Sequence, residues 1–192
     1  MEKTWARVLR ESGARVRERV FLADAGLGAI DPSDGRHIEI VVAGLELARG
    51  VPLAVDVTLV STLHADGTPW ENADSVAGTA CRRVELVKQR TYPELVGNEL
   101  LRLVTAASET GGRLNADGLE LLDAAAELRV RNEPEVLRRS ARRAWRNRWL
   151  TMLSLSVQDE LSATLVNDGV ELLDAASGAA PLSCDVWLDD SD

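Results

Sequence analysis

The pattern of hydrophobic and polar residues predicts helices near both ends of this chain and β-strands between them. Residues 2–21 place apolar side chains near helical spacing among arginines, so one amphipathic helix is expected there, weakened in its middle by Gly13. Two runs rich in β-branched residues follow at 36–42 and 51–60, and a shorter apolar run lies at 100–107. Their composition predicts three strands.

Turn and capping residues mark the remaining elements. A helix is expected over 74–90, opened by Asp74 or Ser75. A second, capped by Asn115 or Asp117, is expected to run to about residue 129, and a third from Pro134 to about residue 165. This order predicts an α/β fold, with a small mixed β-sheet flanked by helices and a C-terminal helical extension.

The same pattern divides the chain into three parts. Residues 1–131 form the expected α/β core, residues 132–176 a helical extension packed on that core, and residues 177–192 an acidic, mobile tail.

Composition narrows the class of protein. The chain has 192 residues, of which 45% are hydrophobic, and a formal net charge of -9, which together are typical of a globular protein. No stretch is apolar enough to cross a membrane and the charged N-terminus does not resemble a signal peptide, so an intracellular protein is expected. Cys81 and Cys184 make no ligand pattern with the histidines, so no zinc site is expected. The acidity argues against a nucleic-acid partner, although local charge matters more than the sum.

Each of the first two predicted strands carries one acid where an apolar residue would be expected, Glu39 in the first and Asp56 in the second. If the strands pair as a hairpin with Val42 opposite Leu53, the two acids face each other on one side of the sheet. The opposite face then carries Ile38, Ile40, Leu53, Val55, Val57 and Leu59. Facing carboxylates repel, and a bound divalent metal would compensate them. The alternative is a slipped register, or acids at an exposed sheet edge.

Two further residues gain meaning beside the acids. Lys88 and Tyr92 are four positions apart, so they share a face at the end of the helix that follows the second strand. If these elements converge on Asp56, Lys88 could orient an attacking water and steady the charge on a scissile phosphate. A metal held by Glu39 and Asp56 would lower the pKa of that water, and Tyr92 could position the water or contact a phosphate. The alternative is a solvated lysine and an ordinary half-buried tyrosine.

Four segments in this order resemble a known family, and they are 38–42, 52–61, 88–92 and 109–113. They are similar to the restriction-endonuclease-like domain that follows the reverse transcriptase in site-specific non-LTR retrotransposons. That domain belongs to the PD-(D/E)xK nuclease class. The resemblance runs from about Trp5 to Trp149, and it implies a metal-dependent fold that nicks DNA, with its lysine moved from the second strand to the next helix.

The resemblance assigns the family's first acid to Glu39, its second acid to Asp56, its lysine to Lys88 and its tyrosine to Tyr92. It implies Mg²⁺ or Mn²⁺ as cofactor, DNA as substrate, action in the nucleus, and descent from or membership of a reverse transcriptase polyprotein. Two positions depart from the family. The first acid is usually aspartate, and Thr58 stands where a standard PD-(D/E)xK enzyme has lysine.

Arginines crowd the last predicted helix. Arg138, Arg142 and Arg146 form one row on it and are the candidates for holding a DNA backbone, with Trp145 and Trp149 on the neighbouring face. The alternative is that the arginines pair with the surplus acids while the tryptophans pack in the core. Two functions therefore stay open. One is a magnesium-dependent deoxyribonuclease, and the other is a catalytically inactive relic that binds nucleic acid or protein.

Overall fold

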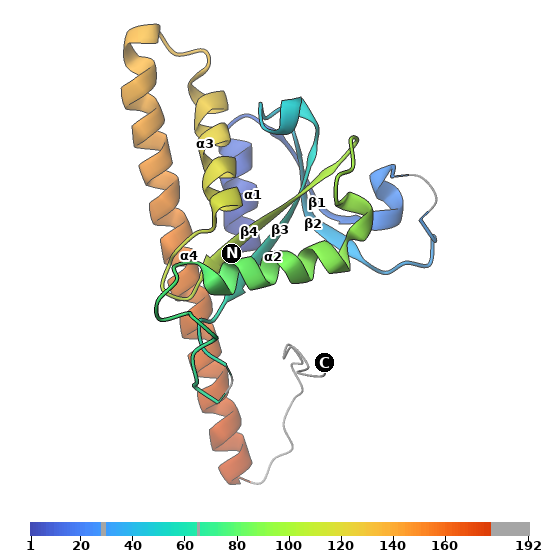
Figure 1. Ribbon diagram of the computed structural model, residues 1–192. Coiled ribbons are helices and arrows are strands. Elements are labelled where there is room, and N and C mark those ends of the chain that lie inside the picture. Colours follow the sequence, from blue (N-terminus) through green and yellow to red (C-terminus); the bar gives the residue numbers. More distant parts are fainter. Residues whose placement is uncertain (28–29, 65, 178–192) are drawn as a thin grey trace. The chain divides into compact units, whose positions relative to one another are not determined.

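The computed structural model describes residues 1–27, 30–64 and 66–177 (Figure 1). The chain falls into two compact units, Met1–Val157 and Gln158–Asp192. The first unit contains the sheet, three helices and the beginning of a fourth, and the rest of that fourth helix belongs to the second unit. Of the predicted acidic tail, residues 178–192 lie outside the described residues. No helix in the described ranges combines the length and the apolar character that a bilayer span requires.

The first unit is built on a mixed sheet of four strands in the order β1-β2-β3-β4. The strands are β1 (Arg15–Phe21), β2 (His37–Ala43), β3 (Leu53–Val60) and β4 (Arg102–Glu109). The β1–β2 and β2–β3 pairs are antiparallel, whereas β3 and β4 are parallel. A parallel pair needs a crossover connection, which the helix α2 (Thr79–Thr91) supplies here. The predicted α/β class with a mixed sheet and a C-terminal helix is therefore confirmed.

The prediction of one helix over 2–21 was wrong, because α1 (Glu2–Glu11) ends early and a strand follows it. Gly13 has a φ of +94°, a left-handed conformation that glycine adopts without strain and that turns the chain away from the helix axis. The residues of β1 alternate between arginine and apolar or acidic side chains, a period of two that favours a strand. Pairing with β2 then outweighs the weak helical periodicity of this segment.

Two buried clusters cover opposite faces of the sheet. The larger one joins α1, α3 (Ala116–Val130) and α4 (Glu135–Ser177) to the strands, through Trp5, Leu9, Ile40, Val55, Leu121, Trp149 and Leu153. The smaller one lies toward the end of α2 and the short helices η1 (Leu22–Ala25) and η3 (Pro93–Leu95), and contains Leu22, Ile38, Ala54, Tyr92, Leu95 and Leu101. The sheet therefore lies between two apolar layers, one packed on each of its faces.

The helix boundaries differ from the predictions in two places. α2 begins at Thr79 rather than near 74, because Ser75 and Val76 both donate backbone N–H groups to the carbonyl of Asn72 in a turn that precedes the helix. α4 runs to Ser177, beyond the predicted end near 165. The start of α3 agrees with the prediction, with Asn115 as its N-cap.

We predict that Asn115→Ala lowers the free energy of unfolding by roughly 2–3 kcal/mol, because the buried side chain makes four hydrogen bonds. Its Oδ1 accepts from Gly118 N and Ala107 N at 3.0 and 3.2 Å, and its Nδ2 donates to Thr105 O and Glu85 Oε1 at 2.6 Å each. Denaturant unfolding measures the loss. Asn132→Ala, in an exposed turn, is the matched control, and an equal loss in both variants would contradict the assignment.

Candidate functional site

The candidate site lies where β2 and β3 separate. The registered pairs between these strands run from Val42↔Leu53 to Ile40↔Val55, so the predicted register is confirmed. Toward its beginning β2 continues to pair with β1, as far as His37, while β3 continues along β4 to Val60. The two strands thus form a fork in the described sheet, with Glu39 on one prong and Asp56 on the other.

Ile38 was predicted on the same face as Ile40, and this was wrong. Ile38 packs with Ala54 and Tyr92 in the smaller cluster, whereas Ile40 belongs to the larger one. The alternation of β2 is interrupted at Glu39, where the registered pairs with β1 pass from Glu18↔Ile40 to Val20↔Ile38. Arg19, which lies opposite Glu39 in this register, forms no registered pair with it and has a φ of +50°, so the backbone is irregular at this point.

The Glu39 carboxylate occupies the head of the fork. Its Oε2 accepts a hydrogen bond of 2.7 Å from the backbone N–H of Val57, on the opposite prong. Burial, and after it the negative charge of Asp56, raise the pKa of Glu39 to about 7, although the Val57 N–H and the Lys88 ammonium act in the opposite direction. The site therefore holds two acids, one of which exchanges its proton near neutral pH.

Asp56 is nearly inaccessible, with 2% of its surface exposed, and Lys88 compensates its charge. The Lys88 Nζ lies 2.9 Å from Asp56 Oδ1, and the Thr58 hydroxyl donates to the same oxygen at 3.0 Å. The Lys88 side chain, on α2, is still 24% exposed. The cation that the facing acids were predicted to need is thus provided, for Asp56, by this lysine.

Each of the two acids has one carboxylate oxygen for which no hydrogen bond or ion pair is described. The hydrogen bonds and ion pairs described for the two acids engage Glu39 Oε2 and Asp56 Oδ1, which leaves Glu39 Oε1 and Asp56 Oδ2 for a cation. Within the described ranges no group of three or more His, Cys, Asp or Glu side chains could enclose a metal. Two carboxylates are donors that Mg²⁺ or Mn²⁺ takes, with water and substrate oxygens completing the shell, and the metal expected at Glu39 and Asp56 stays a prediction.

Tyr92 lies beside the site and has its hydroxyl in use. The phenol donates a 2.9 Å hydrogen bond to the carbonyl of His37, and the residue is 8% exposed. Burial, followed by the charges of Asp56 and Glu39, raises the pKa of Tyr92 to about 12. The side chain therefore ties the end of α2 to the beginning of β2, and the predicted contact with a water or phosphate stays a prediction.

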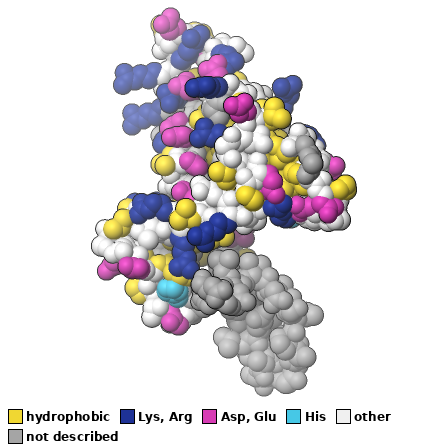
Figure 2. All heavy atoms as spheres, turned by 45° about the vertical axis from the view of Figure 1, so that its right-hand side comes forward, with side chains coloured by type: hydrophobic (Ala, Val, Ile, Leu, Met, Phe, Trp, Pro, Cys, Tyr) yellow, Lys and Arg dark blue, Asp and Glu magenta, His cyan; other side chains and the backbone are white. Residues whose placement is uncertain are grey.

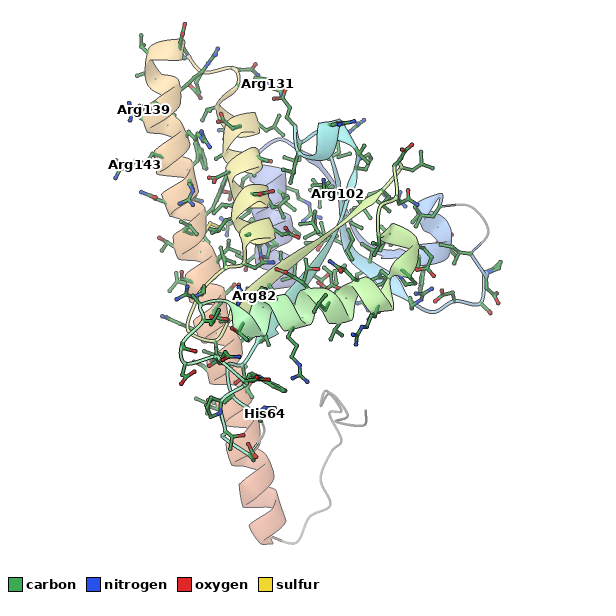
Figure 3. The ribbon with its side chains drawn as sticks, viewed as in Figure 1. His64, Arg82, Arg102, Arg131, Arg139 and Arg143 are labelled. Atoms are coloured by element: carbon green, nitrogen blue, oxygen red, sulfur yellow. The ribbon has the colours of Figure 1, made fainter. Side chains whose placement is uncertain are left out.

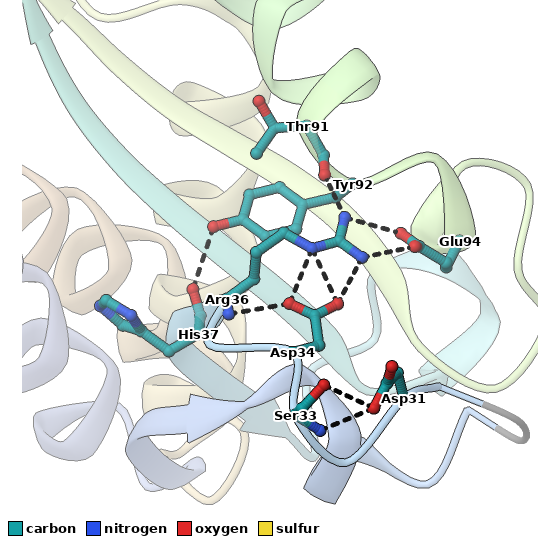
Figure 4. A network of polar contacts seen from close by, with 8 residues as sticks. All are labelled: Asp31, Ser33, Asp34, Arg36, His37, Thr91, Tyr92 and Glu94. Atoms are coloured by element: carbon teal, nitrogen blue, oxygen red, sulfur yellow. Dashed lines mark hydrogen bonds and ion pairs between the residues drawn. The ribbon is translucent and has the colours of Figure 1, made fainter.

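Sequence reasoning missed a second tie between the same two segments, centred on Arg36 (Figure 4). Its Nη2 lies 2.6 Å from Asp34 Oδ2 and 2.6 Å from Glu94 Oε1, and its Nη1 donates to the carbonyl of Thr91. Arg36 stands three residues before Glu39, while Thr91 follows Lys88 by three residues. The network therefore fixes the strand that carries the acid against the helix that carries the lysine. Asp34 at two positions before Arg36 was the only local signal.

The arginine row on α4 is largely paired within the protein. Arg142 lies 2.5 Å from Glu127, and Arg146 lies 2.7 Å from Asp123, both on α3. Arg138 donates to the carbonyl of Glu133 at 2.8 Å. Figure 3 shows Arg139 and Arg143 pointing from α4 away from α3.

The tryptophans of α4 are also engaged with the protein. Trp149 is fully buried and donates to Glu11 at 2.9 Å, and Trp145 lies near the guanidinium groups of Arg129 and Arg148. These contacts are those of the alternative in which acids neutralise the arginines and the tryptophans join the core. The proposed binding of DNA by Arg138, Arg142 and Arg146 stays a prediction.

Comparison with known proteins supplies no family for this chain. No protein-family model matches it, and no curated protein is significantly similar to it. Its function is therefore argued from the geometry at the fork.

We predict that Glu39 makes folding less favourable as the pH rises. The folded chain holds this proton up to a pKa of about 7, above the ordinary value of 4.5, so ionisation between these values lowers the free energy of unfolding, by roughly 2 kcal/mol. In metal-free buffer, Glu39→Gln should therefore unfold at a higher temperature than the wild type at pH 8.5. The two proteins should differ less at pH 5. A difference that does not vary with pH would contradict this.

We predict that Arg36→Met lowers the temperature of unfolding, because the Asp34 and Glu94 carboxylates lose their shared cation and Thr91 O loses its donor. Arg143→Met, an identical change at an exposed arginine of α4, serves as the control. Thermal unfolding at neutral pH measures both. Equal stability of the two variants would show that the Arg36 network does not hold the strand and helix together.

Proposed function

We propose that this protein is a metal-dependent DNA endonuclease of retroelement origin, which nicks DNA by hydrolysing phosphodiester bonds with Mg²⁺ or Mn²⁺. The observation that carries the proposal is the meeting of Glu39, Asp56 and Lys88 at the fork, from two strands and the crossover helix. Action on DNA would place the protein in the nucleus.

The fold supports the resemblance to restriction-endonuclease-like domains without establishing it. Two adjacent antiparallel strands each carry one acid, and the helix that follows them carries the lysine before a parallel strand closes the unit. Lys88 also stands out in composition, since only one other lysine, Lys3, is found among the 22 Lys and Arg residues. A compact ammonium on a flexible stem suits a crowded site better than a planar guanidinium does.

The chemistry asked of the site is the addition of water across one P–O bond. The water oxygen bonds to phosphorus, the bond to one sugar oxygen breaks, and that oxygen gains a proton. Glu39 and Asp56 would hold the cation, which would supply Lewis-acid polarisation of the phosphoryl oxygen and of the attacking water. Asp56 is held in one orientation by Lys88 and Thr58, and Glu39 by the Val57 N–H. Lys88 is then the electrostatic partner of the attacking water and of the charge that develops on phosphate.

The glutamate in place of the family's usual aspartate is accommodated at the fork. Glu39 reaches one methylene further than aspartate, and the Val57 N–H binds one of its oxygens on the opposite prong. Because this hydrogen bond restricts rotation of the side chain, the second oxygen of Glu39 also stays at the head of the fork. Such orientation is what a metal ligand needs, because misplacement of about an ångström is costly to catalysis.

The second candidate function is a catalytically inactive relic that binds nucleic acid or protein. The observation that favours it is the Asp56–Lys88 ion pair, which already compensates the more buried acid. A site whose lysine replaces the metal would keep its fold and lose its activity. This candidate predicts DNA binding without nicking, and binding that is unaffected by Asp56→Ala.

We predict that the protein nicks supercoiled plasmid DNA in the presence of Mg²⁺, and that Asp56→Ala and Lys88→Ala each lower the rate by about 100-fold or more. Lys88→Arg should not restore the rate, since it keeps the charge but not the size of the ammonium. Asp24→Ala and Lys3→Ala, at exposed positions, are the matched controls. Gel analysis of plasmid topology measures the rates. Absence of nicking, or absence of divalent-ion binding in calorimetry, would overturn the nuclease proposal.

A further inference from the structure

Three arginines without an acidic partner among the described residues lie on α2, the helix that carries Lys88. Arg82, Arg83 and Arg90 are exposed on that helix, and in the described part of the chain no carboxylate forms an ion pair with any of them. Arg82 bonds only neutral oxygens, those of Ala77 and Thr79. This differs from the α4 row, where Arg142 and Arg146 are neutralised by α3. Figure 2 shows basic side chains gathered on one face together with a histidine.

Arg83 is held in place by an aromatic side chain. Its guanidinium lies 3.8 Å from the ring centroid of Trp70, in the loop between β3 and α2. The ring of His64 lies 3.4 Å from the same tryptophan, tilted by 45°. With Arg83 and His64 both against it, the indole supports the arginine and is not an open platform on which a base could stack.

The loop that carries Trp70 is itself folded. His64 donates its backbone N–H to Thr68 O at 2.7 Å, and Trp70 donates its own to Thr62 O at 3.1 Å. The indole Nε1 also donates to Ser61 O at 3.0 Å. The tryptophan is thus fixed from both backbone and side chain, and the arginine stacked on it loses little further freedom on binding a ligand.

A guanidinium that lies over an aromatic ring keeps its N–H donors in its own plane, where they point outward and stay available to a ligand. Those donors match two oxygens of a phosphate, a geometry that lysine does not offer. Arg83 and Arg90 are seven residues apart, so they lie on nearly the same side of α2, whereas Lys88 points to Asp56 on the side that faces β3. At about 1.5 Å of rise per residue, the two arginines are about 10 Å apart along the axis.

We propose that the exposed face of α2, with Arg83 supported by Trp70, binds the phosphate backbone of DNA. The proposal rests on the proposed function for the identity of the partner. It assigns the DNA contact to Arg82, Arg83 and Arg90 in place of the α4 row. Glu71 and Asp74 are exposed in the same loop and oppose the contact, so the affinity should be modest and strongly dependent on salt.

The test measures binding of a short fluorescein-labelled DNA duplex by anisotropy in EDTA, which removes divalent ions and so prevents metal-dependent cleavage. Reversing Arg82, Arg83 and Arg90 to glutamate should weaken binding by about 100-fold and flatten its salt dependence. Arg139→Glu with Arg143→Glu, on exposed α4 positions, should change it by less than about twofold. An equal loss in both variants, or no loss in the first, overturns the proposal.

A second set of variants separates support by the aromatic ring from simple charge. Trp70→Leu, which keeps every charge, should weaken binding by about threefold or more, and Arg83→Lys should weaken it similarly. Glu71→Gln with Asp74→Asn should strengthen it. If Trp70→Leu binds as the parent does, the assigned role of the stack is wrong. Arg82→Glu with Arg90→Glu leaves the stack untouched and tests the face even if the loop variants fold poorly.

The outcome for this surface is independent of catalysis. If the α2 reversals leave plasmid nicking unchanged, the proposed nuclease activity stands and the proposed α2 binding surface is wrong. If DNA binding depends on the α2 arginines but no nicking is observed, the proposed surface stands and the proposed nuclease activity is wrong. A wild-type protein that binds no DNA even at low salt overturns both.

Discussion

The ion pair between Asp56 and Lys88 is the interaction on which the arrangement of the first unit depends. A carboxylate with 2% of its surface exposed is strongly destabilising unless a cation and hydrogen bonds compensate it. The compensating ammonium comes from the crossover helix, so α2 must lie over β3 at one position along its length. The Arg36 network and the hydroxyl of Tyr92 then fix the end of the same helix to the start of β2. These three contacts together hold α2 against β2 and β3 at the fork.

This arrangement gives the two acids different chemistry. Lys88 contacts Asp56 directly, whereas Glu39 has only a backbone N–H and a more distant ammonium, and its pKa is raised to about 7. Without a metal, the net negative charge of the site is limited in two ways: Glu39 keeps its proton up to near neutral pH, and Lys88 places a positive charge beside Asp56. A divalent ion would compete with the proton on Glu39 and could share Asp56 with the lysine. Whether the site acts as an enzyme or as a relic depends on which of these cations it prefers.

The strands that carry the acids could be predicted from sequence, whereas the contacts around them could not. β-branched composition located β2 and β3, and matching the acids across them gave the register from Val42↔Leu53. The prediction failed at Ile38, because the backbone is irregular where Arg19 lies opposite Glu39, and such an irregularity leaves little trace in composition. The Arg36 network joins residues 55 and 58 positions apart, and no local pattern reports such a contact.

The arginines show that the sequence also does not reveal which charges are neutralised by contacts between distant segments. Spacing alone favours the α4 row, since Arg138, Arg142 and Arg146 recur every four residues, but spacing does not reveal that α3 presents Asp123 and Glu127 to that row. A net charge of -9 leaves room for local basic surfaces only where folding separates cations from acids. In the first unit such a separation occurs on α2, beside a buried acid that has drawn Lys88 inward. The same helix thus compensates the charge of the site on its inner face and presents arginines on its outer face, and both roles follow from its position over β3.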